Sequence, residues 1–228
     1  MKVEAARIGP AMNRTTGLRL FCAVLAAAIL PLGPARATED DTQFWVVGTI
    51  VGEPAEDLTA ALEINPRFRG ATVGDDLLQT RATLDYRLSP AVAVGAGLLY
   101  AEFQGGNETR THQQVNIRAG QVQFRTRLEE RFFAGADRME LRLRQRVQAT
   151  FPLGEGTAFV TSGEMYSILR SRRNDGDAKV DQWRAQFALQ HSLGAGVTGA
   201  VGYLLILVPR DGPNRVSHVP QIGLTVRL

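Results

Sequence analysis

Apolar and polar residues alternate along much of this chain with a period of two. In residues 139–153, Leu141 and Leu143 alternate with Arg142 and Arg144, and the same parity continues to the end of the stretch. A period of two is typical of a β-strand with one apolar and one polar face, because successive side chains of a strand point to opposite sides. An α-helix would spread these residues around its circumference. The stretch therefore predicts an amphipathic β-strand.

The same alternation predicts ten strands, separated by short segments rich in Gly, Pro, Asn and Asp. They span residues 43–51, 58–69, 77–88, 92–103, 114–133, 139–153, 157–169, 180–193, 197–208 and 219–228. In the fifth segment the apolar positions change parity at Gly120, which indicates a β-bulge. We therefore expect an all-β fold: an antiparallel up-and-down transmembrane β-barrel of about ten strands, within a range of roughly eight to twelve.

Residues 1–37 have the features of a cleaved secretory signal peptide. A short basic region precedes an apolar run at 20–32, and the small-x-small sequence at 35–37 fits a cleavage site. Met12 is an alternative start residue, since the residues before it add nothing that a signal needs. The expected organisation is a signal peptide at 1–37 and a single β-barrel domain at 38–228.

The charge and the cysteine content exclude several classes of function. The whole chain has 26 basic and 23 acidic residues, but residues 38–228 carry 21 basic and 22 acidic, so the basic character belongs to the leader. Charge thus gives no reason to expect a nucleic-acid partner. Cys22, the single cysteine, also lies in the leader, and the three histidines show no metal-ligand spacing. We expect no cofactor and no metal site.

Several features favour a membrane barrel over a soluble one. The strands reach the nine to eleven residues that a tilted strand needs to cross a bilayer, and their even number lets both termini lie on the periplasmic side. Aromatic residues near strand ends resemble the girdles of such barrels: Phe44, Trp45, Tyr100, Phe103, Phe132, Phe133, Phe151, Phe159 and Trp183. The long connection at 104–113 and a terminal Leu228 in place of Phe count against this interpretation.

The location that follows is the bacterial outer membrane. The expected partners are outer-membrane lipid and the outer-membrane assembly machinery, which would contact the C-terminal strand at 219–228. A soluble periplasmic ligand-binding barrel is the alternative, because a period of two does not say which face is inside. No feature of the sequence indicates an oligomeric state.

Three local motifs carry a resemblance to a known bacterial family. They are Asp-Thr-Gln-Phe-Trp at 41–45, Phe-Arg-Thr-Arg-Leu-Glu-Glu-Arg-Phe at 124–132, and Arg-Met-Glu-Leu-Arg-Leu-Arg at 138–144. With these motifs the chain resembles the domain-of-unknown-function 2490 family, exported proteins regarded as outer-membrane β-barrels. The resemblance implies a fold and a location. It implies no catalytic residue, because the family has no established activity.

Residue chemistry gives little reason to expect an enzyme. A membrane lipid hydrolase or acyltransferase would need a nucleophile, a base and an orienting group within reach of one another. His191 and Ser192 are adjacent on a strand, as are Ser217 and His218, so the two side chains of each pair point to opposite faces. His112 has no such neighbour in any motif. Lipid hydrolysis or acyl transfer therefore stays an alternative without assigned residues.

The arginine-rich polar face is the strongest remaining signal. Its residues are predicted to form a charge network in the lumen: Arg67, Arg69, Arg81, Arg87, Arg125, Arg127, Arg131, Arg142, Arg144, Arg146, Arg184 and Arg227, with Glu63, Asp85, Glu129 and Glu140. A hairpin should set the ladder 125–131 beside the ladder 140–146. We interpret the protein as a structural or binding barrel with an Arg/Glu-filled lumen. A narrow anion-selective channel and a lipopolysaccharide-binding barrel are the alternatives.

Overall fold

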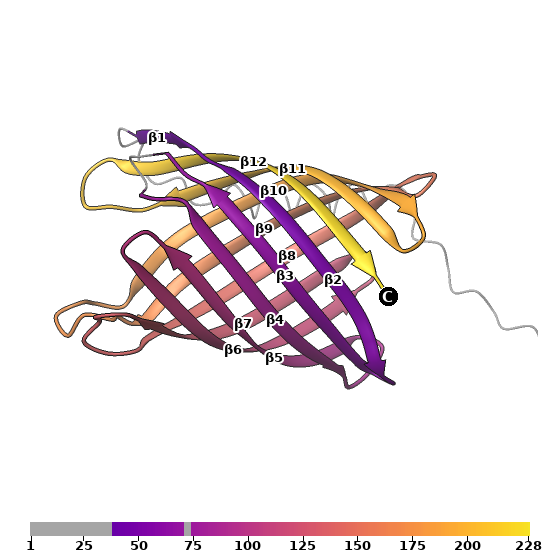
Figure 1. The fold of residues 1–228 in the computed structure, drawn as a ribbon, viewed down its shortest axis with the longest axis horizontal. Helices are drawn as coiled ribbons and strands as arrows, with labels where there is room; N and C mark the ends of the chain where they lie inside the picture. Colours follow the sequence, from indigo (N-terminus) through magenta and orange to yellow (C-terminus); the bar gives the residue numbers. More distant parts are fainter. Residues whose placement is uncertain (1–37, 71–73) are drawn as a thin grey trace, which may run out of the picture.

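The computed structural model describes residues 38–70 and 74–228, which form one closed β-barrel (Figure 1). The predicted signal peptide at 1–37 lies outside the described residues. No helix long and apolar enough to cross a membrane occurs in the described part of the chain. The strands are β1 (Thr38–Thr42), β2 (Phe44–Ala55), β3 (Leu58–Phe68), β4 (Leu77–Arg87), β5 (Val92–Phe103), β6 (Gly106–Ala119), β7 (Val122–Phe133), β8 (Glu140–Gly154), β9 (Thr157–Arg170), β10 (Lys179–Gly194), β11 (Val197–Val208) and β12 (Asn214–Arg227).

Consecutive strands from β2 to β12 pair as antiparallel neighbours, which confirms the predicted all-β, up-and-down barrel. The barrel closes where β12 meets β1 and β2, and this pairing is parallel. Both β1 and β2 keep one constant register with β12, and the Gln43 amide between them donates to the His218 carbonyl at 2.9 Å. They therefore act as one strand, and the barrel has eleven strand positions.

The eleventh strand comes from the segment that the sequence predicts as one bulged strand. Residues 114–133 belong to two strands, β6 and β7, joined by a turn at 120–121. Gly120 has φ of 60°, a left-handed conformation that suits a tight turn, so the change of parity marks a hairpin and the predicted bulge is wrong. The long connection expected at 104–113 is likewise a short turn followed by β6.

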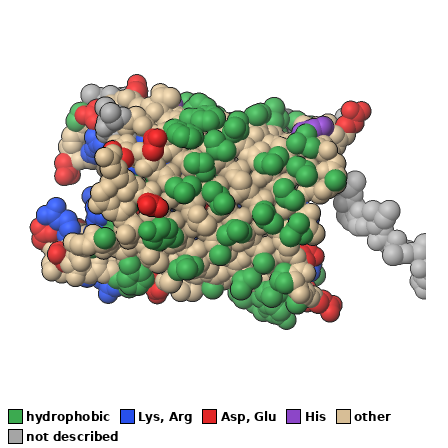
Figure 2. Space-filling view, viewed as in Figure 1, with side chains coloured by type: hydrophobic (Ala, Val, Ile, Leu, Met, Phe, Trp, Pro, Cys, Tyr) green, Lys and Arg blue, Asp and Glu red, His purple; other side chains and the backbone are tan. Residues whose placement is uncertain are grey.

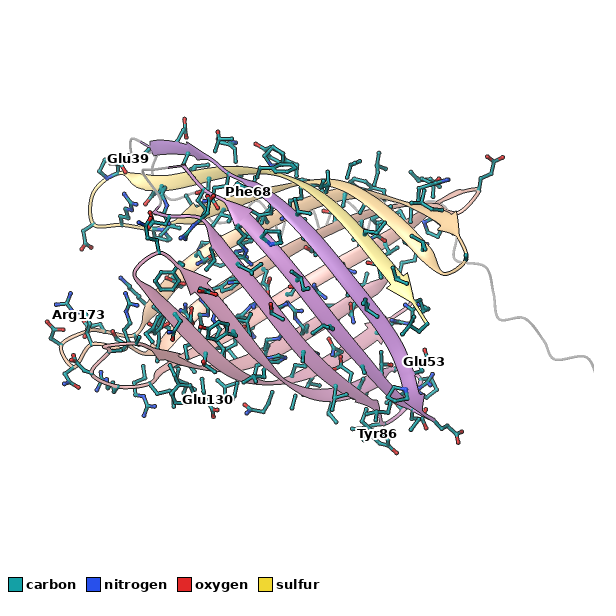
Figure 3. All side chains as sticks on the ribbon, viewed as in Figure 1. Glu39, Glu53, Phe68, Tyr86, Glu130 and Arg173 are labelled. Carbon is teal, nitrogen blue, oxygen red and sulfur yellow. The ribbon has the colours of Figure 1, made fainter. Side chains whose placement is uncertain are left out.

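An odd number of strands also overturns the expected placement of the chain ends. β1 begins beside the start of β12, so the first described residue and Leu228 lie at opposite ends of the barrel (Figure 1). The loop end carries residues 69–70 and 74–76, which follow β3 and precede β4, and the connections at 104–105, 134–139, 171–178 and 209–213. The turn end carries those at 56–57, 88–91, 120–121, 155–156 and 195–196. Figure 3 labels Phe68, Glu130 and Arg173 towards the loop end, and Glu53 and Tyr86 towards the turn end.

Polarity is inverted relative to a soluble protein. Among the described residues, 18 buried side chains are polar or charged and 11 are apolar. Large apolar side chains cover the outer face, and Figure 2 shows them across the middle of the barrel with charged groups gathered at its ends. Neighbours on β5 illustrate the alternation, since Leu98 is 51% exposed and Leu99 is 1% exposed. The apolar side of each strand therefore faces outwards.

The aromatic residues divide between the two faces. Phe44 and Phe68 stack at 6.3 Å near the loop end, and Phe151 and Phe159 stack at 6.4 Å near the turn end. Trp45 does not belong to an outer girdle, because it is buried inside the barrel. Phe103 and Phe133 also line the interior, so these three assignments to a girdle are wrong. In each case the place of the residue in the alternation along its strand, and not its distance from the strand end, decides whether the side chain points into or out of the barrel.

Candidate functional site

The charged interior is organised by the hairpin of β7 and β8. Its register sets Arg131 opposite Glu140, Glu129 opposite Arg142, Arg127 opposite Arg144, and Arg125 opposite Arg146. All eight side chains share one face, because each strand contributes every second residue. Alternation in the sequence is thus converted into two facing ladders of charge inside the barrel.

Glu129 is the centre of the network. It is 2% exposed, and its Oε2 accepts hydrogen bonds from Nε and a terminal nitrogen of Arg142 at 2.9 and 2.5 Å. Its Oε1 accepts from Arg144 at 2.7 Å and lies 4.0 Å from a terminal nitrogen of Arg127. A carboxylate held by two guanidiniums in a space that excludes water makes strong charge-assisted hydrogen bonds.

Glu164 on β9 continues the network. Its Oε1 accepts from Arg125 at 2.8 Å and from Nε of Arg144 at 3.0 Å. Its Oε2 accepts from a terminal nitrogen of Arg144 at 3.1 Å and from the Tyr166 hydroxyl at 3.2 Å. Arg144 therefore bridges Glu129 and Glu164, which ties β7, β8 and β9 together.

A second cluster lies nearer the loop end. Glu108 on β6 accepts two hydrogen bonds from Arg110 at 2.5 and 2.6 Å and two from Arg131 at 2.6 and 3.2 Å. Arg131 also pairs with Glu140 across the hairpin. Forked contacts of this kind fix both guanidinium planes.

A polar relay connects the network to β4. Both Nε and a terminal nitrogen of Arg127 donate to the Gln114 side chain at 2.9 and 2.6 Å, and Gln114 donates to Asp85 at 2.7 Å. His112 is 2% exposed beside them, and Gly97 makes room for its ring. A Cβ atom at Gly97 would lie 2.5 Å from His112 Cε1, so the small residue on β5 is required for this packing.

The other predicted residues of the lumen lie in different surroundings. Glu63 pairs with Arg81 at 3.2 Å, and the Arg146 guanidinium reaches Gln123 at 3.4 Å. Arg67 and Arg184 face the interior near the loop end, where their guanidiniums lie 3.7 and 5.4 Å from the Trp45 ring centroid.

Three predicted residues lie away from the central network. Arg69 follows the last residue of β3 and bonds to the loop carbonyl of Asp75 at 2.5 Å. Arg87 pairs with Asp57 at 2.8 Å, and Arg227 lies 3.8 Å from Glu53, both at the turn end and well exposed. Each of these arginines lies at a strand end. There the alternation of polar and apolar residues continues, but the side chain can reach solvent.

Sequence reasoning missed a group of interior residues on β6. Glu108, Arg110 and His112 are all buried, but they precede the predicted start of the fifth segment at residue 114. The signal was present, because residues 108, 110, 112 and 114 alternate as polar inward positions. Two further charges, both half-buried, lie near the loop end, where Asp181 approaches Arg142 at 3.6 Å and Arg215 lines the interior.

A cavity of about 300 Å³, here called the mouth cavity, opens inside the barrel near the loop end. Strand-end residues from around the barrel line it, among them Trp45, Arg67, Tyr166, Arg184, Ile206 and Arg215. Its volume is at the lower end of the range of ligand pockets, about 300–1,000 Å³. Part of the lining is apolar, since Trp45, Ile206 and Val208 line the cavity and belong to a cluster that also contains Leu204 and Val219. Arginines make up much of the remaining lining.

The histidines do not form a catalytic group with serine in the part of the chain that the structure describes. His112 Nε2 lies 3.5 Å from Thr83 Oγ1, and His191 Nδ1 lies 2.8 Å from Thr157 Oγ1. His218 contacts Tyr203 on the outer face, whereas Ser217 is buried on the inner face. The predicted separation of the Ser–His pairs therefore holds for Ser217 and His218.

Acidic residues also fail to form a metal site within residues 38–70 and 74–228. Asp175 in the exposed loop 171–178 accepts hydrogen bonds from Arg173 at 3.1 and 3.2 Å. These hydrogen bonds lower the pKa of the Asp175 carboxyl, as expected for a solvated ion pair.

The fold and sequence are similar to those of known proteins. An uncharacterized protein of Methylorubrum extorquens is 26% identical over 221 residues, which cover 90% of this chain and 96% of the relative. Among solved structures, the NanC porin has a TM-score of 0.51 and 14% identity, and the match covers 75% of this chain and 89% of the porin. At that identity the likeness concerns the fold.

A family model supplies the assignment for the sequence itself. The family described as "Protein of unknown function (DUF2490)" matches residues 42–217, which include the motifs at 124–132 and 138–144 and all of the motif at 41–45 except Asp41. The match confirms the resemblance seen in the sequence. This chain belongs to the DUF2490 family of proteins of unknown function.

Proposed function

We propose that this protein is an outer-membrane β-barrel whose lumen is closed by the Arg/Glu network, so that it serves as a structural or binding barrel and not as a diffusion pore. The observation that carries the proposal is the inverted polarity: charge inside and a continuous apolar surface outside. A closed barrel satisfies every strand edge, as a membrane-spanning sheet must. A soluble periplasmic barrel would expose that apolar surface to water.

The lumen network supports closure of the barrel interior. Glu129, Arg142 and Arg144 are each at most 6% exposed, and their side chains come from two adjacent strands and reach a third through Glu164. Barrels of about this size have interiors that long side chains largely fill. Paired charges also leave little net field to attract ions across the middle.

The proposal includes no enzymatic activity. It also includes the expected partners, which are outer-membrane lipid around the apolar surface and the assembly machinery at the last strand. β12 supports the second expectation, because Ile222 and Leu224 face outwards on a strand that closes the barrel.

The first prediction concerns location. After expression in a Gram-negative host, we expect the protein in the outer-membrane fraction, with a faster gel mobility before boiling than after it. An intact barrel binds less detergent than its unfolded chain, which gives this difference. Recovery in the soluble periplasmic fraction without a mobility shift would contradict the proposed location and support the soluble ligand-binding alternative.

The second prediction concerns the lumen. In planar bilayers we expect no steady conductance from the wild-type protein, because the buried side chains of Glu129, Arg142 and Arg144 occupy the lumen. The triple variant Glu129→Ala, Arg142→Ala, Arg144→Ala should show measurable ion conductance. The double variant Arg227→Ala, Glu53→Ala removes an exposed pair at the turn end and serves as the control. Steady anion-selective currents from the wild type would favour the channel alternative instead.

A further inference from the structure

The mouth cavity is lined by more cationic than anionic side chains. Nine arginines and one glutamate line it. That glutamate, Glu108, already accepts hydrogen bonds from Arg110 and Arg131. Arg81, Arg142 and Arg144 in the lining pair with Glu63, Glu129 and Glu164, which lie outside it. The excess positive charge of the cavity therefore lies mainly on Arg67 and Arg184, whose partners are neutral.

Arg67 and Arg184 have only neutral hydrogen-bond partners among the described residues. Arg67 donates to Asn65 at 3.2 Å and to Gln79 at 2.5 Å, and Arg184 donates to Gln182 at 2.8 Å. Neither forms an ion pair of 4.0 Å or less with a carboxylate in residues 38–70 and 74–228. An amide oxygen satisfies a guanidinium N–H but leaves its full positive charge uncompensated.

Arg215 provides a separate indication that a ligand group is accommodated here. Its Nε is buried and has no hydrogen-bond partner within the part of the chain that the structure describes. A buried donor without an acceptor is costly, and an anion in the cavity would supply that acceptor. Arg215 lies on β12, whereas Arg67 and Arg184 lie on β3 and β10, so donors approach the cavity from several sides.

The cavity also offers an apolar surface. Arg67 lies 3.7 Å from the Trp45 ring centroid, and Arg184 lies 4.5 Å from the Tyr166 ring centroid, so the aromatic rings hold both guanidiniums in place. Ile206 and Val208 form the adjoining wall. A ligand that matches both surfaces has a charged end for the arginines and an apolar body for Trp45 and Ile206.

We propose that the mouth cavity binds a small organic anion, with its carboxylate or phosphate group held by Arg67, Arg184 and Arg215 and its apolar part against Trp45 and Ile206. Guanidiniums bind both oxyanions through paired hydrogen bonds. A lipid headgroup does not fit this position, because the cavity lies inside the barrel while lipid chains pack outside it. The ligand is a diffusible solute. This inference rests on the barrel interior and is independent of the proposed location.

Tryptophan fluorescence tests the proposal directly. The chain has two tryptophans, and Trp183 can be replaced by Phe so that Trp45 in the cavity is the single reporter. Folded barrel in detergent is titrated at constant ionic strength with phenyl phosphate, benzoate and neutral benzyl alcohol. We expect a saturable change with phenyl phosphate, benzoate or both, and none with benzyl alcohol. A response to one anion alone identifies the oxyanion class.

Arginine variants distinguish binding at a specific site from general electrostatic attraction of the anion to the protein. Arg67→Gln and Arg184→Gln should each raise Kd at least about tenfold, because each removes a charge-assisted contact. Arg227→Gln, which removes an exposed arginine at the turn end, should leave Kd unchanged. The gel-mobility shift on boiling shows which variants fold. Because Arg67→Gln and Arg184→Gln are made separately, one of them can still test the site if the other does not fold.

Three results would overturn the proposed anion site. If neither anion gives saturable binding, or if benzyl alcohol binds as well as phenyl phosphate, the cavity is not an anion site. Equal Kd values for wild type, folded Arg67→Gln and folded Arg184→Gln would also overturn it. None of these results bears on membrane insertion, which the fractionation experiment tests separately.

Discussion

Replacing Glu129 by alanine is expected to lower the free energy of unfolding by about 3–5 kcal/mol, the usual cost of removing one partner from a buried ion pair. Glu129 is 2% exposed and binds Arg142 and Arg144 directly. Alanine leaves both guanidiniums in a space from which water is excluded. Arg144 keeps Glu164, but Arg142 is left with Asp181 at 3.6 Å.

Unfolding in urea, followed by Trp fluorescence in phospholipid vesicles, measures this change. Glu53→Ala is the matched control, because Glu53 and Arg227 are each more than half exposed and lie 3.8 Å apart at the turn end. Exposed pairs contribute about 0–1 kcal/mol, so the control should remain close to wild type. Similar losses for both variants would contradict a stabilising role of the central network.

The strands and their inward faces could be predicted from the sequence because parity is a local property. Residues 140, 142, 144 and 146 alternate with apolar neighbours, and a short connection at 134–139 places them beside 125–131. These facts alone predict that the charged residues of 125–131 and 140–146 face each other across the hairpin. The choice between inside and outside needed a further argument, since arginines on one strand are too costly against lipid.

The hairpin at Gly120 shows where local reasoning fails. A change of parity accompanies both a bulge and a two-residue turn, and the sequence around 119–122 fits either. Interpreting it as a bulge merged β6 and β7 into one strand, while the connection expected at 104–113 left Glu108, Arg110 and His112 outside the predicted strands. Because of this merger, the predicted number of strands was even and both chain ends were expected at the same end of the barrel. Both expectations are wrong.

The barrel seam and the mouth cavity depend on contacts that are distant in sequence. Alternation cannot show that β12 pairs in parallel with β1 and β2, because a parallel neighbour has the same pattern as an antiparallel one. In the cavity, the neutral partners of Arg67 and Arg184 are Gln79 and Gln182. Nothing in the sequence distinguishes these arginines from those that find carboxylates.

An arginine placed on the outer face should separate a membrane barrel from a soluble one. Leu98 lies in the middle of β5, faces outwards and is 51% exposed. On a surface in water, Leu98→Arg would change stability by no more than about 0.5 kcal/mol. At the midplane of a bilayer the same change is expected to cost about 2–4 kcal/mol, because the charge must leave water or distort the lipid.

The depth dependence of this cost provides the control. Leu153 is 60% exposed and lies near the turn end, beside the connection at 155–156. There Leu153→Arg is expected to cost only about 0–1 kcal/mol, since the side chain reaches the interface. Unfolding in phospholipid vesicles compares the two variants with wild type. If Leu98→Arg is as stable as Leu153→Arg, the apolar band does not face lipid, and its exposed surface must be covered by something other than a bilayer.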